Sequence, residues 1–118
     1  MELNFNCVRD ILIQCEGIPL DGYLLFNDLV SLLPKYTEDE LQYTCRMLYK
    51  EKYISCVVKS YSGVPQIKRI KDITLTGHEL LEDIRSNSVL AKLKEQLPKL
   101  AFSTISELWP YIKKLSSP

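Results

Sequence analysis

One segment rich in β-branched and aromatic residues interrupts an otherwise helical sequence, and it limits the folds open to the chain. It runs over 53–73 and has a turn sequence, 62–65, near its middle. β-Branched and aromatic residues favour strands, and glycine and proline favour turns. We therefore predict a β-hairpin, with an alternating second strand in which Lys68, Ile70 and Asp72 separate Ile67, Arg69, Lys71 and Ile73.

A capping box predicts the helix that precedes this hairpin. Thr37 and Glu40 have the spacing at which a threonine side chain accepts from a first-turn amide while the glutamate reaches back to the threonine amide. Four residues then recur at helical spacing: Leu41, Thr44, Cys45 and Leu48. This spacing indicates a helix over about 38–51.

Two shorter predictions cover the N-terminal third of the chain. Apolar residues at helical spacing indicate a helix over 4–16 that ends near Gly17. A strand at 23–26 and a short helix follow, with Asn27 as the N-cap and Pro34 closing the helix.

After the hairpin, Thr76 and Glu79 form a second capping box, so a helix should begin there. The sequence 85–88 interrupts its apolar stripe, which then resumes as far as Pro98. A last helix is expected after Ser103, with a kink at Pro110.

The order of these elements describes a winged helix-turn-helix: helix, short helix, capped helix, hairpin, helix. We predict an α+β, mainly helical fold with a two- or three-stranded wing sheet and added C-terminal helices. Residues 1–85 would form the winged-helix core, and 86–118 a helical extension packed on the same single domain. Another small α+β domain with the same succession of elements is the alternative.

Composition limits the partners and the cellular location that we expect for the chain. Fifteen basic residues balance fifteen acidic ones, so nucleic acid can be attracted only by a local patch. No apolar run could cross a bilayer, and the first residues lack the basic start of a signal peptide. Four cysteines form no C-x-x-C pair, which favours reduced, packed thiols. We expect a cytoplasmic protein with no membrane association.

The segment 75–85 resembles part of a family of small phage-associated and prophage-associated bacterial proteins of unknown function. The resemblance rests on a Leu-Thr, a Gly-His, an apolar pair and an Asp-Ile-Arg: Leu75, Thr76, Gly77, His78, Leu80, Leu81, Asp83, Ile84 and Arg85. The segment 36–54 is similar to the central helix of the family. The resemblance covers about 5–97 and implies a winged-helix fold and a phage origin, without an established activity.

The central helix supplies the first set of candidate DNA-binding residues. If its apolar residues face inward, Gln42, Tyr43, Arg46 and Lys50 lie on or beside the outward face. Arg46 could bind a guanine edge, Gln42 an adenine edge and Lys50 a phosphate. The alternative is a capped, solvated helix, because the acidic run 38–40 would repel DNA.

The hairpin supplies the second set: Lys59, Lys68, Arg69 and Lys71, with Tyr61 near the tip. These residues could hold phosphate and sugar. They could equally protect an edge strand from unwanted pairing.

The C-terminal helices carry many apolar residues that either cover the core or form a homodimer interface. The candidate interface residues are Phe102, Leu108, Trp109 and Ile112. His78 is the lone histidine, and we expect it in the first turn of its helix in an architectural role. We expect no catalytic residue, metal or cofactor and therefore no enzyme.

Two functions follow from these expectations. The first is a DNA-binding protein with a role in transcription regulation, with double-stranded DNA as its partner. The second is a winged-helix module that binds a host or phage protein without binding DNA.

Overall fold

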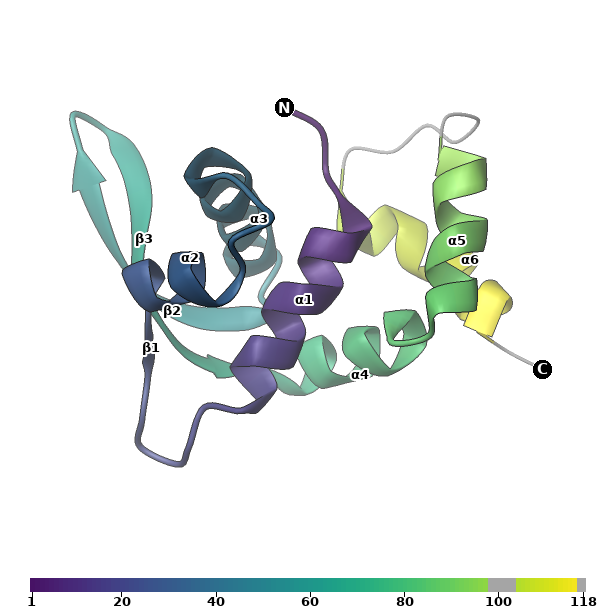
Figure 1. Ribbon diagram of the computed structural model, residues 1–118, viewed down its shortest axis with the longest axis horizontal. Helices are drawn as coiled ribbons and strands as arrows, with labels where there is room; N and C mark the ends of the chain where they lie inside the picture. The colour runs from purple at the N-terminus through teal and green to yellow at the C-terminus, as the bar shows by residue number, and fades with distance from the viewer. Residues whose placement is uncertain (98–103, 117–118) are drawn as a thin grey trace.

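A mainly helical α+β architecture is present in the computed structural model, which describes residues 1–97 and 104–116 (Figure 1). The elements are α1 (Phe5–Glu16), β1 (Leu24–Leu25), α2 (Phe26–Leu32), α3 (Glu38–Lys50), β2 (Ile54–Tyr61), β3 (Val64–Ile73), α4 (Leu75–Ile84), α5 (Asn87–Gln96) and α6 (Ile105–Ser116). This confirms the predicted fold class at the level of helices and one antiparallel sheet.

The sheet has three antiparallel strands in the order β1-β3-β2. Ser62 and Gly63 both have positive φ, 51° and 80°, which defines a two-residue turn of type I′ between β2 and β3. The predicted hairpin is thus confirmed. In Figure 1 its tip projects from the body, at the end of the molecule opposite α5 and α6.

Strand β3 differs from the predicted alternation. Ile67 and Ile70 are both buried, and Ile73 is half-buried, so the apolar period is three residues rather than two. The pairing register explains this, because it shifts between Ser55 and Cys56 and again between Val57 and Val58. Each shift leaves one extra residue in β3, Lys71 and Lys68 respectively. These bulges let every third residue face the core.

One face of the sheet is covered by α1 and α3, and this layer contains most of the core. α1 contributes Phe5, Val8, Ile11 and Leu12, and α3 contributes Leu41, Cys45 and Leu48, all at most 1% exposed. The same buried cluster continues into α4, α5 and α6 through Leu80, Leu81, Ile84, Leu93, Ile105 and Ile112.

All four cysteines are free thiols in or beside this core. Burial raises the pKa of Cys7 to about 11 and that of Cys56 to about 12, and it also raises the pKa values of Cys15 and Cys45. Thiols held protonated in this way are poor nucleophiles, so they act as small apolar side chains.

The N-cap of α3 is the one predicted, whereas the N-cap of α4 is a different threonine from the one predicted. The capping box of α3 is present: Glu40 N donates to Thr37 Oγ1 at 3.1 Å, and Thr37 N donates to Glu40 Oε1 at 3.3 Å. For α4, the predicted cap at Thr76 is wrong. The N-cap is Thr74, whose hydroxyl accepts from Gly77 N at 3.1 Å.

Gly77 explains why α4 begins where it does. A Cβ at this position would lie 2.1 Å from the Tyr53 carbonyl oxygen and 2.7 Å from Ile73 Cγ1. The Thr74 hydroxyl also donates to the carbonyls of Lys52 and Tyr53, at 2.8 and 3.0 Å. The first turn of α4 is therefore seated directly on the backbone at the base of the hairpin.

The start of α2 also differs from the prediction. The helix begins at Phe26 with Leu25 as N-cap and without a side-chain cap, so Asn27 lies inside it. The Asn27 carbonyl accepts from Ser31 Oγ at 3.2 Å. Because Leu25 pairs with Arg69 in the sheet, the chain passes straight from β1 into α2.

The last helix, α6, is tied to the base of the hairpin. Glu51, just after α3, accepts from Ile105 N and Ser106 N at 3.0 and 2.9 Å and so caps α6. Tyr53 contacts Trp109 edge-on, with ring centroids 5.7 Å apart. α6 contains Pro110 as expected, whereas Ser103 lies outside the described residues.

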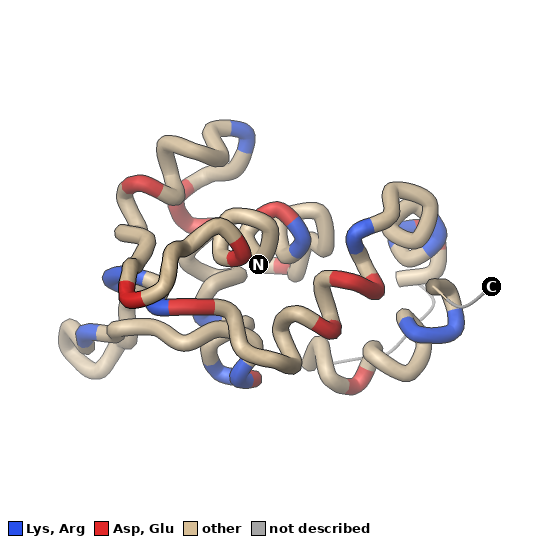
Figure 2. The backbone as a smooth tube through the Cα atoms, turned by 90° about the horizontal axis from the view of Figure 1, so that it is seen from below, with Lys and Arg blue, Asp and Glu red and all other residues tan. Residues whose placement is uncertain are grey.

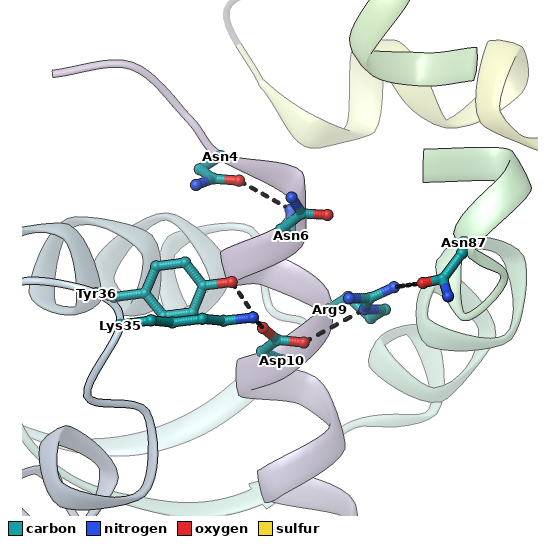
Figure 3. A network of polar contacts seen from close by, with 7 residues as sticks. All are labelled: Asn4, Asn6, Arg9, Asp10, Lys35, Tyr36 and Asn87. Carbon is teal, nitrogen blue, oxygen red and sulfur yellow. Dashed lines mark hydrogen bonds and ion pairs between the residues drawn. The ribbon is translucent and has the colours of Figure 1, made fainter. Parts of the chain in front are cut away.

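A polar network on α1 joins three parts of the fold (Figure 3). Asp10 accepts from Tyr36 Oη at 2.6 Å and forms ion pairs with Lys35 at 3.0 Å and Arg9 at 3.3 Å. Arg9 in turn donates to Asn87 at 2.6 Å. Burial alone would raise the pKa of Asp10, but the hydrogen bonds from Tyr36 and Lys35 outweigh it and the pKa is lowered.

Candidate nucleic-acid interface

The exposed side of the hairpin gathers most of the basic residues that the sequence singled out. We call this surface the hairpin patch: Tyr23, Lys59, Tyr61, Lys68, Arg69 and Lys71. Each of these side chains is exposed. They come from β2, β3 and the residue preceding β1, and the sheet register brings them together.

At the tip, Tyr61 lies between two lysines. The Nζ atoms of Lys59 and Lys68 are each 5.4 Å from the centroid of its ring. The pKa of Tyr61 is lowered, chiefly by the hydrogen bond that Lys68 offers it and further by the charges of Lys59 and Lys68, because both favour the phenolate. The tip therefore combines one exposed aromatic ring with two exposed cations.

At the other end of the hairpin patch, Arg69 lies over Tyr23, with 4.9 Å between the guanidinium carbon and the ring centroid. Arg69 and Lys71 also line a hollow of about 670 Å³ beneath the loop that precedes β1. Asp21, Asp72 and Glu16 line the same hollow, and Glu16 is paired with Arg85. The carboxylates reduce the positive charge at this end, so the tip is the more strongly basic part of the patch.

Figure 2 shows blue and red segments interspersed along the described part of the backbone. This agrees with the equal numbers of acidic and basic residues. Electrostatic attraction to a polyanion would therefore be local, and it would fall off within about a Debye length.

The N-terminal end of α3 places carboxylates next to the hairpin. Glu38 and Asp39 are exposed and line a groove of about 550 Å³, whose opposite wall includes Lys68 and Arg69. These carboxylates suit the positive end of the helix dipole. They would also repel phosphates brought close to this end of the helix.

Gln42 has a structural partner. Its Oε1 accepts from Ile67 N at 2.6 Å, and its Nε2 lies 3.4 Å from the Ile67 carbonyl oxygen. β1 ends at Leu25, opposite Arg69, so the Gln42 carboxamide pairs with the edge of β3 just beyond β1. A carboxamide held in this way lacks free groups for an adenine edge.

The other predicted residues of α3 have different surroundings. Arg46 is half-buried and donates through Nε to Gln42 Oε1 at 3.3 Å. Tyr43 is half-buried and Lys50 is exposed. Of the four α3 residues predicted to contact DNA, Gln42 and Arg46 thus have hydrogen-bond partners within the fold.

The candidate interface residues of α6 face inward. Leu108 is 3% exposed and Ile112 is fully buried, which matches the alternative that these residues cover the core. Trp109 is half-buried and donates from Nε1 to Asp83 at 2.8 Å. Phe102 lies outside the described residues.

Tyr23 was missed by sequence reasoning. It precedes β1 and is 55% exposed, and only the pairing of β1 with β3 brings it next to Arg69. The sequence signal that could have pointed to Tyr23 is the short apolar strand that follows it. The strand with which this segment pairs could not be identified from the sequence. His78 lies in the first turn of α4 as expected, and its side chain is exposed.

Two further properties concern residues 1–97 and 104–116. No helix in these ranges combines the length and apolar character needed to cross a bilayer. Nor do they contain a group of three or more His, Cys, Asp or Glu side chains placed to hold a metal ion.

Comparison with known proteins identifies the family of the chain. Neither a curated protein nor a solved structure matches the chain. One family model does match, over residues 2–103, and its description is "Hypothetical protein (DUF2513)". Since the match spans most of the sequence, the chain belongs to the DUF2513 family of hypothetical proteins.

Proposed function

We propose that this protein is a phage-type or prophage-type winged-helix protein that binds double-stranded DNA through its hairpin and acts as a regulator in the cytoplasm. The observation that carries the proposal is the hairpin patch, in which four exposed cations accompany two exposed tyrosines. The phage setting rests on the sequence resemblance alone, and the regulatory role rests on the winged-helix interpretation.

The winged-helix part of the proposal rests on the order of elements. A short strand and two helices precede a projecting hairpin, with α3 as the second helix of the pair (Figure 1). In this proposal residues 1–85 are the winged-helix core and 86–118 the helical extension. α5 and α6 contact α4, and α5 also contacts α1.

Charge suggests how DNA would be held. Lys59, Lys68, Arg69 and Lys71 can each replace a counterion at a phosphate. Glu38 and Asp39 oppose close approach of α3, and the Gln42 carboxamide is occupied by Ile67. We therefore propose that phosphate contacts supply most of the affinity and base contacts supply little.

A salt titration tests this proposal. Four phosphate contacts give a slope of about −3.6 for the logarithm of the affinity for duplex DNA against the logarithm of salt concentration. Fluorescence anisotropy with a mixed-sequence duplex measures that slope. An absence of binding at low salt, where phosphate contacts are strongest, would remove the proposal.

A matched pair of variants locates the contacts. K59E/K68E reverses two charges of the hairpin patch, and K92E/K94E reverses two exposed lysines of α5, so both variants change the net charge equally. We expect K59E/K68E to abolish measurable duplex binding and K92E/K94E to weaken it only slightly. Equal losses in the two variants would mean that net charge, rather than the hairpin, governs binding.

A protein-binding module is the second candidate, and exposed apolar residues favour it. Leu20, on the loop before β1, is 94% exposed, and Leu32 at the end of α2 is 52% exposed. Together with the carboxylates Glu38 and Asp39, they suit a protein partner better than DNA. A homodimer also stays a prediction, which sedimentation of the free chain would measure.

A further inference from the structure

We propose that the hairpin patch is a stacking platform for unpaired bases, so that the protein binds single-stranded nucleic acid more tightly than duplex. This inference rests on the proposed function, because the same cations would meet the phosphates. It adds a role for the two tyrosines and predicts which state of nucleic acid is preferred.

Both rings are accessible. Tyr61 is 44% exposed and Tyr23 is 55% exposed, and neither is needed to fill the core. Each has a cation over its ring, from Lys59 and Lys68 in one case and from Arg69 in the other. Alternating aromatic rings and cations is the arrangement that binds single strands without sequence preference.

The rings also have a spacing that one strand can span. Arg69, which covers Tyr23, pairs with Val57, and Tyr61 lies four residues further along β2. At the rise of a β-strand this offset is roughly 13 Å along the sheet, and the step from β1 across β3 to β2 adds about 10 Å across it. A strand of several nucleotides could therefore stack on both rings while its phosphates pass Lys59, Lys68 and Arg69.

A base can take the place of a lysine over a ring. An exposed cation–π contact is weaker than the stacking of a base on an aromatic ring. The lysine Nζ sits on a flexible side chain, so it can move from the ring to the adjacent phosphate and keep a favourable partner. Binding thus exchanges the weaker contact for a stack and a charge pair.

A duplex would gain less from the same surface. Its bases are already stacked and paired, so the tyrosines would reach only sugar and phosphate. A duplex is also wider than a single strand and would come nearer to Glu38 and Asp39 across the groove beside Lys68. A single strand is narrower, so it can contact Lys68 and Arg69 while its other phosphates stay farther from Glu38 and Asp39 than those of a duplex.

The test compares three probes of equal length, about 15 nucleotides: an oligothymidine, its duplex, and an abasic strand with the same phosphates. Anisotropy at roughly 50 mM and 200 mM salt measures the affinity of the wild-type protein and of Y61A, Y23A and Y61F. Circular dichroism confirms that each variant is folded, which is expected because both tyrosines are exposed.

We expect oligothymidine to bind about a hundredfold more tightly than the abasic strand, a factor of about ten for each of the two rings, and about tenfold more tightly than the duplex. Y61A and Y23A should each lose about tenfold for oligothymidine and almost nothing for the abasic strand, whereas Y61F, which keeps the ring, should match the wild type.

Two results would overturn the inference, and they can be told apart. If the duplex and the oligothymidine bind equally and the alanine variants change nothing, the stacking platform is wrong while the proposed DNA binding stands. If none of the probes binds at the lower salt concentration, the proposed function fails as well.

Discussion

The two ends of the hairpin differ in almost every physical property. At the base, Tyr53 and Ile54 are buried, and the Tyr53 carbonyl accepts from Thr74 N at 3.1 Å. At the tip, Tyr61 is exposed, and its partners are two lysines at the ring. The base holds contacts that cannot be exchanged without unfolding, whereas the tip holds contacts that a ligand can replace. Stability and binding should therefore be separable by mutation along one pair of strands.

The largest effect is expected at the base, from G77A. The added Cβ would lie 2.1 Å from the Tyr53 carbonyl oxygen, and a backbone atom cannot move aside easily. We expect a loss of about 3 kcal/mol in the free energy of unfolding, measured by urea denaturation. The control is G17A, whose Cβ would be an ordinary 3.5 Å from the Gln14 carbonyl oxygen. A G77A protein as stable as G17A would show that α4 is not seated on the hairpin.

The next effect is expected midway along the hairpin, from Q42L. This change leaves the buried Ile67 without the partner of its backbone N–H, which should cost about 1–3 kcal/mol. The control Q66L alters an exposed neighbour and should change stability little. If Q42L instead weakened DNA binding without lowering stability, Gln42 would be a base reader as the sequence first suggested.

A smaller effect separates two neighbouring threonines at the base. Thr74 caps α4 and bonds two carbonyls, so T74A should cost about 1 kcal/mol. Thr76 makes a longer bond of 3.3 Å to the Lys52 carbonyl, and T76A should cost about 0.5 kcal/mol or less. Thermal denaturation of the two variants measures the difference. A larger loss of stability in T76A than in T74A would indicate that Thr76 is the N-cap of α4, as the sequence predicted.

The smallest effect concerns the titration of the tyrosines at the two ends. Burial raises the pKa of Tyr53, whereas Lys68 and Lys59 lower that of Tyr61. On raising the pH, Tyr61 should become a phenolate before Tyr53 does, and K68Q should raise the pKa of Tyr61 alone. NMR of ring carbons follows both groups. Simultaneous titration of the two rings would mean that the ends of the hairpin are electrostatically alike.

Much of the fold follows from local pattern. The turn of Ser62 and Gly63 and the cap of Thr37 with Glu40 need only neighbours in the sequence, and both were predicted. The bulges at Lys68 and Lys71 were not predicted. Isoleucines three residues apart fit neither the two-residue period of a regular strand nor a bulged strand uniquely, unless the packing of the core is already known. Thr74 and Thr76 cannot be ranked as caps without the Tyr53 carbonyl, which comes from 21 residues earlier in the chain.

The candidate site was predicted less completely, for the same reason. The basic residues of the hairpin could be recognised individually, because a lysine or arginine can be proposed as a phosphate contact from its own charge alone. Tyr23 and Gln42 depend on contacts between distant segments, Arg69 for one and Ile67 for the other. Tyr23 lies at the surface and Gln42 binds the edge of β3, and only the register of the sheet distinguishes these two roles.

The most direct test of this account is to map nucleic-acid binding residue by residue. Amide chemical shifts of the isotope-labelled protein would be followed while a short oligonucleotide is added at low salt. We expect the main changes at Tyr23 and along the hairpin from Lys59 to Lys71, with α3 little affected. Changes centred on the exposed face of α3, with a silent hairpin, would contradict it.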